Sequence, residues 1–141
     1  MYGDTAVMRA QARRMRQRAD DIRAEADELA ARADAVPWAG LAAEAMRRMA
    51  HGHAARLRSC ADAHDAAADA LVRHAREVDH LKEVIAAIEH RVLHLLEAAT
   101  GGLAGLVAHV VPDVVDHWAS HFDPPPSGSR AWLDVHVPSP A

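Results

Sequence analysis

The sequence predicts an all-α fold: a long antiparallel helical hairpin, similar to a coiled coil, with a third helix folding back on the distal half of helix two. Three observations predict it. Alanine carries much of the apolar content and aromatic residues are only 4%, which suits close-packed helices better than a sheet. Large apolar residues recur every seven residues on both sides of a short break. No proline occurs between Leu41 and Thr100, so the second helix can run unbroken.

The break is the run VPWAG at residues 36–40. Pro37 has no N–H and disfavours a helical conformation of the residue before it, so the first helix should end near Ala35 or the residue after it. Gly40 supplies the backbone freedom that a sharp reversal needs. Trp38 offers a large apolar surface to wedge into the bend. We interpret this run as the tip of an αα-hairpin.

In the first helix, from about residue 4 to residue 36, each large apolar residue is followed four residues later by alanine. The large residues are Met8, Met15, Ile22, Leu29 and Val36, and the alanines are Ala12, Ala19, Ala26 and Ala33. The alanine row would let a second helix approach closely. The charged outer face is interpreted as solvated, or alternatively as a partner-docking surface. Local pairs are expected on it, namely Arg16–Asp20, Arg23–Asp27 and Glu28–Arg32.

The second helix continues the seven-residue pattern and is expected to run about 90 Å at about 1.5 Å per residue. One row is Ala50, Leu57, His64, Leu71, Val78, Ile85, Val92 and Ala99, and the other, three residues on, is His53, Cys60, Ala67, His74, Leu81, Ile88 and Leu95. Both rows are predicted to face the first helix. Cys60 would then be a small buried side chain.

The distal part of the second helix needs a different cover, because the first helix reaches only to about His74. The sequence predicts three parts: a hairpin over 1–100, a third helical stretch over 101–122 kinked at Pro112, and a proline-rich tail over 123–141. Weak ordering of the tail is favoured over docking of Trp132. Candidate partner-interface residues are Met8, Met15, Ile22, Leu29, Val78, Leu81, Ile85, Ile88, Val92 and Leu95.

Composition excludes several functional classes. The net charge of −4 does not indicate nucleic-acid binding, and the single cysteine cannot form an intrachain disulfide. The start of the chain has no basic region before an apolar run, so no cleavable signal peptide is expected. The most apolar stretch is too short and polar to span a membrane. Without a Gly-rich phosphate loop, an H-E-x-x-H motif or a Cys–His pattern, no catalytic residue and no enzyme activity are predicted.

Eleven histidines are unusual for a chain of 141 residues. Two i,i+4 pairs, His90/His94 and His117/His121, have the spacing of a chelating pair. A di-iron bundle uses E-x-x-H twice, and only one copy occurs, at Glu77. No metal site and no cofactor are therefore predicted. The seam histidines 53, 64 and 74 either reach water or act as a pH switch that weakens association below about pH 6.

The tip and its arms resemble the WXG family of small helical-hairpin proteins of type VII (ESX) secretion systems, best known from actinobacteria. The resemblance covers about residues 8–76 and rests on Trp38, Ala39 and Gly40 between two alanine- and charge-rich helices. It implies export without a cleaved signal to the cell surface or beyond, as a homodimeric or heterodimeric four-helix bundle, and no catalysis. The family's Y-x-x-x-[D/E] export motif after helix two is absent, because the single tyrosine is Tyr2.

The expected function is therefore non-enzymatic: a type VII secretion-associated or secreted protein that pairs with a second WXG-type protein, with an effector or with the secretion machinery. A cytoplasmic helical-bundle adaptor or chaperone for a toxin or effector is the alternative. A His-rich metal-binding bundle is a third and less favoured reading.

Overall fold

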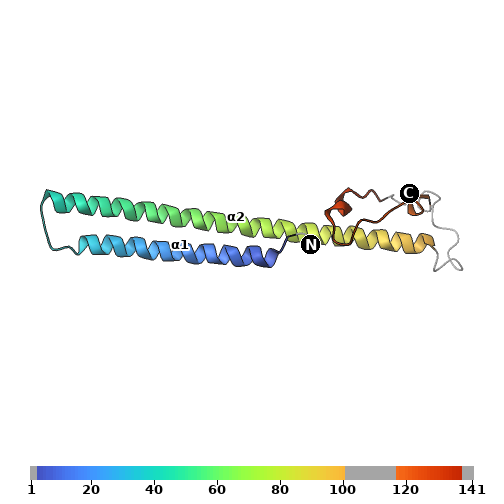
Figure 1. Ribbon diagram of the computed structural model, residues 1–141, viewed down its shortest axis with the longest axis horizontal. Coiled ribbons are helices and arrows are strands. Elements are labelled where there is room, and N and C mark those ends of the chain that lie inside the picture. Colours follow the sequence, from blue (N-terminus) through green and yellow to red (C-terminus); the bar gives the residue numbers. More distant parts are fainter. Residues whose placement is uncertain (1–2, 101–116, 138–141) are drawn as a thin grey trace. The chain divides into compact units, whose positions relative to one another are not determined.

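The computed structural model describes residues 3–100 and 117–137 (Figure 1). Helix α1 spans Thr5–Asp34, helix α2 spans Leu41–Thr100, and a short 3-10 helix spans Arg130–Asp134. No strand occurs in these residues, so the all-α prediction is confirmed. The expected third helix lies mostly outside the described residues. Of it, only 117–122 is seen, as a short helical segment that ends in a turn.

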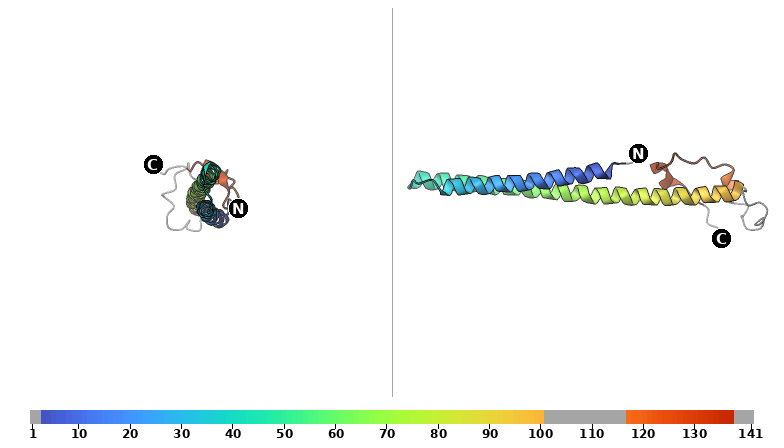
Figure 2. Two further views of the ribbon diagram at one scale, coloured as in Figure 1. Left: turned by 90° about the vertical axis from the view of Figure 1, so that its left-hand side faces the viewer. Right: turned by 90° about the horizontal axis from the view of Figure 1, so that it is seen from below.

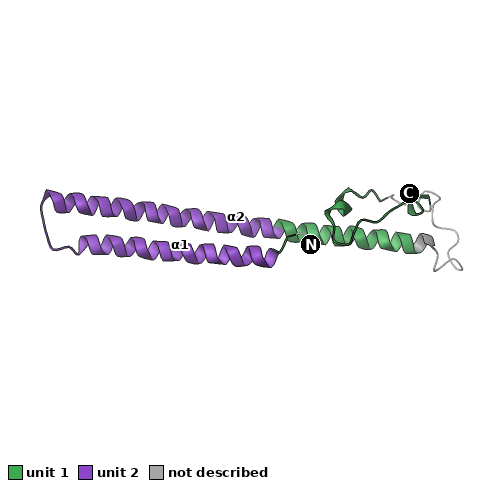
Figure 3. Ribbon diagram, in the orientation of Figure 1, with its two compact units in different colours: residues 1–4, 77–141 green, residues 5–76 purple. Residues whose placement is uncertain are grey.

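Two compact units are distinguished along the chain (Figure 3). One is the hairpin Thr5–Arg76, and the other joins residues 1–4 to residues 77–141. The boundary agrees with the expectation that the first helix covers the second only to about His74. No described helix is both long and apolar enough to cross a membrane.

In the hairpin, α1 and α2 run side by side in opposite directions (Figures 1 and 2). Their contact is an alanine seam. Its members are Ala12, Ala19, Ala26 and Ala33 on α1 and Ala54, Ala61, Ala68 and Ala75 on α2. All eight are buried, and the larger Met8, Met15, Ile22 and Leu29 are only half-buried. Small side chains let the two backbones approach closely, and the larger residues flank the contact.

The predicted position of the second inward-facing row of α2, three residues after the first row, is wrong. The buried alanines follow the large residues by four positions, as on α1, and not by three. His53, Cys60, Ala67 and His74 are consequently exposed, and Cys60 is a free, solvent-facing thiol. The reason is that the closest approach of two helices selects the row with the smallest side chains.

A basic residue occupies the next seven-residue position beyond each end of the alanine row of α2. Arg47, seven residues before Ala54, donates from Nη2 to the carbonyl oxygens of Val36 and Trp38, both at 2.9 Å. Lys82, seven residues after Ala75, donates from Nζ to Gly3 O at 2.6 Å. Sequence reasoning missed both cations, although the interruption of the alanine row is visible in the sequence.

Polar side chains also bridge the two helices, in a ladder of four pairs, of which three are Arg–Asp ion pairs and the fourth joins Asp34 to the ring of His51. Its members are Arg16–Asp69 at 2.7 Å, Arg23–Asp62 at 2.8 Å, Asp27–Arg58 at 2.7 Å and Asp34–His51 at 2.9 Å. Arg23 follows Arg16 by seven residues on α1, and its partner Asp62 precedes Asp69 by seven residues on α2. The pairs of Asp27 and Asp34 with Arg58 and His51 are related in the same way. This antiparallel register corrects the expected local pairs Arg16–Asp20 and Arg23–Asp27. Of the three predicted, only Arg32–Glu28 forms.

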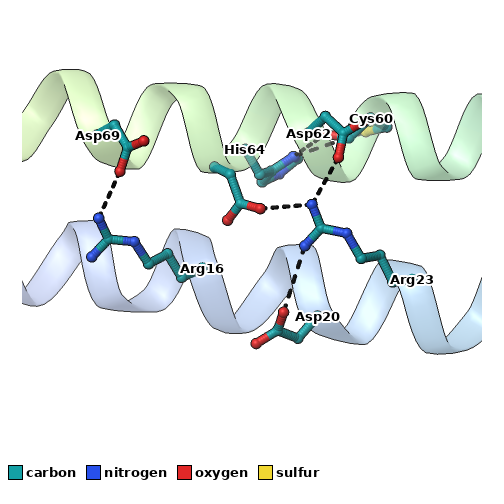
Figure 4. Close-up of polar contacts among 8 residues, drawn as sticks. Arg16, Asp20, Arg23, Cys60, Asp62, His64 and Asp69 are labelled. Carbon is teal, nitrogen blue, oxygen red and sulfur yellow. Dashed lines mark hydrogen bonds and ion pairs between the residues drawn. The ribbon is translucent and has the colours of Figure 1, made fainter.

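Arg23 is the most heavily paired member of the ladder (Figure 4). It contacts Asp62 at 2.8 Å, Asp65 at 2.7 Å and Asp20 at 3.5 Å. Hydrogen bonds to Asp62 and then Asp65 raise the pKa of Arg23 above its ordinary value. The guanidinium therefore stays charged and holds two carboxylates of α2 against α1.

In the unit formed by residues 1–4 and 77–141 (unit 1 in Figure 3), Trp132 is the centre of a small apolar core. It is 1% exposed and packs with the buried Ile85 and Val92 of α2. Seven partly buried residues surround this core: Ile88, Leu96, Trp118, Phe122, Leu133, Val135 and Val137. The described part of the tail is thus docked on α2, which differs from the weak ordering expected for residues 123–141.

Local bonds shape the tail around this tryptophan. Trp132 Nε1 donates to Pro126 O at 3.0 Å, and Gly128 N donates to a Glu89 carboxylate oxygen at 3.2 Å. Ser129 caps the 3-10 helix by accepting from Ala131 N. The indole N–H is thereby satisfied inside an apolar contact, as a buried Trp requires.

Two glycines allow a matched test of the hairpin. Gly40 has φ +109°, and Gly52 has ordinary helical φ; an added Cβ meets no atom within 4 Å at either position. We expect Gly40→Ala to destabilise the hairpin by about 1–3 kcal/mol through backbone strain. Gly52→Ala should stabilise it by about 1 kcal/mol through helix propensity. Urea unfolding followed by far-UV circular dichroism measures both, and equal signs would contradict this account.

Candidate partner-docking surface

The tip of the hairpin is built by residues 35–40 between α1 and α2. Ala35 N still donates to Ala31 O at 3.0 Å, and the helical path then ends before Pro37, close to where it was predicted. Trp38 N donates to Val36 O at 3.0 Å, and Gly40 O accepts the first bond of α2 from Glu44 N at 3.0 Å. The tip is therefore a short, internally hydrogen-bonded reversal.

Trp38 does not wedge into the bend as predicted. It is 47% exposed, and Ala39 and Gly40 beside it are exposed as well. The bend is held by its own backbone bonds and by Arg47, so the indole is not needed to fill it. Trp38 therefore presents apolar surface at the outside of the tip.

Two further large apolar side chains are exposed in the first turns of α2. Leu41 is 85% exposed and Met49 is 65% exposed. Scattered exposed apolar residues are normal on a protein surface. Here the three of them fall within twelve consecutive residues, 38–49, which points to the tip end of the hairpin as a contact region.

A shallow groove runs over the outward face of α2 next to these residues. It is lined by Ala45, Arg48, Met49, Gly52, His53 and Arg56. Gly52 is unusual, because glycine inside a helix costs about 1 kcal/mol relative to alanine. A Cβ at Gly52 would meet nothing within 4 Å. Among the residues that the structure describes, no packing contact accounts for this glycine.

The predicted partner-interface residues divide into two groups. Met8, Met15, Ile22 and Leu29 flank the alanine seam and are half-buried. On the distal part of α2, Val78, Ile85 and Val92 are buried and Leu81, Ile88 and Leu95 are half-buried. Ile85 and Val92 are covered by Trp132 of the same chain. Sequence reasoning missed the α2 groove, whose only signal was the lone Gly52 in a helix of 60 residues.

The seam histidines do not have the burial on which the pH hypothesis depended. His53 and His74 are exposed, and His64 is half-buried. His64 Nδ1 lies 3.0 Å from Cys60 O and 3.9 Å from Cys60 Sγ. The structure thus places Cys60 and His64 on one turn of α2 but gives them no enclosed site.

Comparisons with protein-family models, with curated proteins and with solved structures found no match.

Proposed function

We propose that this protein is a non-enzymatic interaction protein, associated with or secreted by a type VII system, which acts by pairing its hairpin with a helix of a partner. The main support for this pairing is the presence of Gly52 in the groove on the outward face of α2. A helical glycine whose added Cβ would meet no described atom within 4 Å is explained if a second backbone approaches there, because only glycine permits that approach. The association with type VII secretion rests on Trp38-Ala39-Gly40 at the bend.

The side chains that line the groove indicate which kind of partner helix would fit it. Ala45, Met49 and Gly52 form an apolar floor, and Arg48 and Arg56 line it as well. A helix with small apolar residues between carboxylates would fit this pattern, because opposite charges at the rim guide association. The exposed face of α1 has this character at Asp21, Ala24 and Glu28, so a second copy of the chain can supply it, as can a different chain of the same type.

A pair of Gly52 variants tests this docking. Gly52→Leu should abolish association, because the larger side chain occupies the space of the incoming backbone, and Gly52→Ala should weaken it by about tenfold or less. Sedimentation of the pure protein and capture from extracts of the source organism give the readouts. Both substitutions leave the hairpin folded by circular dichroism, since the position faces open space. Association unchanged in Gly52→Leu would refute the docking surface.

Export is tested separately by following the chain in culture supernatant with and without a functional type VII secretion ATPase. ATPase-dependent appearance in the supernatant supports the proposed association. Retention in the cytoplasm together with an effector, independent of the ATPase, would instead establish the adaptor or chaperone function.

A further inference from the structure

A row of histidine and glutamate side chains lies on the solvent-facing side of the distal part of α2. Its members are His80, Glu83, His90, His94 and Glu97, and all five are exposed. On the opposite side of the helix, Ile85 and Val92 are buried beneath Trp132. The row therefore makes no contribution to the apolar core of this unit.

Histidine is a poor choice for a solvated helix face. Its helix propensity is lower than that of glutamate, lysine or arginine, which normally occupy such positions. Packing does not compensate for this cost, since the rings of His90 and His94 are exposed. A role for the imidazole nitrogens themselves accounts for the choice.

The two rings already lie beside each other. The centroids of His90 and His94 are 4.6 Å apart, with an interplanar angle of 69°. A tetrahedral ion that binds imidazole nitrogen at about 2.0–2.1 Å needs two donor nitrogens roughly 3.3 Å apart. Neighbouring rings one helical turn apart can present one nitrogen each at that separation with a small change in side-chain torsions.

A carboxylate lies on the next turn of the same face. Glu97 Oε2 is 3.9 Å from His94 Nδ1. This distance is too long for a hydrogen bond, but it places a negative charge beside the ring pair, and a negative charge favours a bound cation. In the described residues, no group of three or more His, Cys, Asp and Glu is arranged to hold a metal. Any metal held by these residues would therefore have the two imidazoles as its protein ligands and would take its other ligands from elsewhere.

We propose that His90 and His94 chelate one divalent transition-metal ion of the imidazole-binding class, such as Zn²⁺ or Ni²⁺, with Glu97 supporting His94. Water or a donor from a partner chain completes the coordination. This departs from the sequence-based prediction of no metal site, because spacing alone did not show the ring arrangement or the carboxylate beside it. The inference is independent of the proposed docking function.

Calorimetric titration of the full, untagged chain with Zn²⁺ and Ni²⁺ tests the site. We expect His94→Gln to weaken binding by about tenfold or more, and Glu97→Gln to weaken it by a smaller factor. The matched control is His121→Gln in the second i,i+4 pair. His117 and His121 have ring centroids 4.8 Å apart, but the helical segment covers only residues 117–119, and His121 lies in the turn that follows it. His121→Gln should leave the tighter binding unchanged within about twofold.

Selectivity provides a second readout. Mg²⁺ and Ca²⁺ prefer oxygen ligands and should not compete. Metal should also raise the midpoint of thermal unfolding in the wild-type chain and not in His94→Gln. The proposal is overturned if wild-type binding is weaker than about 1 mM, if His94→Gln binds as tightly as wild type, or if His121→Gln loses binding equally.

Discussion

Trp132→Ala is expected to release the tail from α2. The side chain is 1% exposed and forms the core of its unit with Ile85 and Val92. Truncation of a buried Trp or Phe to alanine typically costs about 3–5 kcal/mol, and Trp132 is the residue that the tail contributes to the buried centre of this core. Hydrogen exchange measures the result, because Ser129, Trp132 and Val135 donate their amides to backbone carbonyls within the tail. These amides should exchange at close to unprotected rates in the variant.

The control for this experiment is Trp38→Ala, which removes the same side chain from a half-exposed position. It should leave the exchange of the tail amides unchanged. A second readout follows from the apolar face that the tail covers, since exposure of Ile85 and Val92 should increase binding of an apolar dye in Trp132→Ala only. If the tail amides stay protected in Trp132→Ala, other contacts hold the tail and its docking does not depend on this tryptophan.

Ala26→Leu is expected to destabilise the hairpin strongly. Ala26 is 0% exposed and lies in the alanine seam. Extra carbons in a well-packed contact force the two helices apart, at a typical cost of about 1–3 kcal/mol. For a unit the size of Thr5–Arg76, that corresponds to a fall in Tm of roughly 4–8 °C for each kcal/mol. Thermal unfolding followed by circular dichroism measures the shift.

Ala67→Leu is the matched control, because Ala67 is exposed on α2, directly before the buried Ala68 of the same seam. Its effect on the free energy of unfolding should stay within about 0.5 kcal/mol. Equal stability of the two variants would mean that the helices are not closely packed at the alanine row.

Local signals in the sequence were sufficient to predict where the two long helices lie and where α1 ends. The proline-free run 41–100 became α2, and Pro37 ended α1 near the predicted residue. On α1, the rule that alanine follows each large residue by four positions identified the buried row correctly. The same rule holds on α2 and is visible in the sequence, but the large residues alone suggest a spacing of three, so the prediction places His53, Cys60 and His74 on the wrong face.

The candidate site was less predictable than the fold. The position of Trp38 at the tip was expected, but its exposure depends on whether other bonds already hold the bend, and Arg47 supplies those bonds from eleven residues beyond Val36. Gly52 is the lone glycine in the run 41–100, and the sequence alone gives it no role. Its meaning came from the absence of any neighbour near its Cβ position, which is a property of the folded chain.

By itself, the sequence determined that this protein forms two long amphipathic helices joined at a Pro-Trp-Ala-Gly bend, because propensity and periodicity are local properties of the chain. Only the tertiary structure decided which rows are buried, which charges pair across the hairpin and what covers the distal part of α2. Arg16 has an acidic neighbour within its own helix and another on α2, and the antiparallel register selects Asp69. Trp132 likewise docks because α2 presents Ile85 and Val92 without a first helix to cover them, a circumstance that no local pattern in the tail contains.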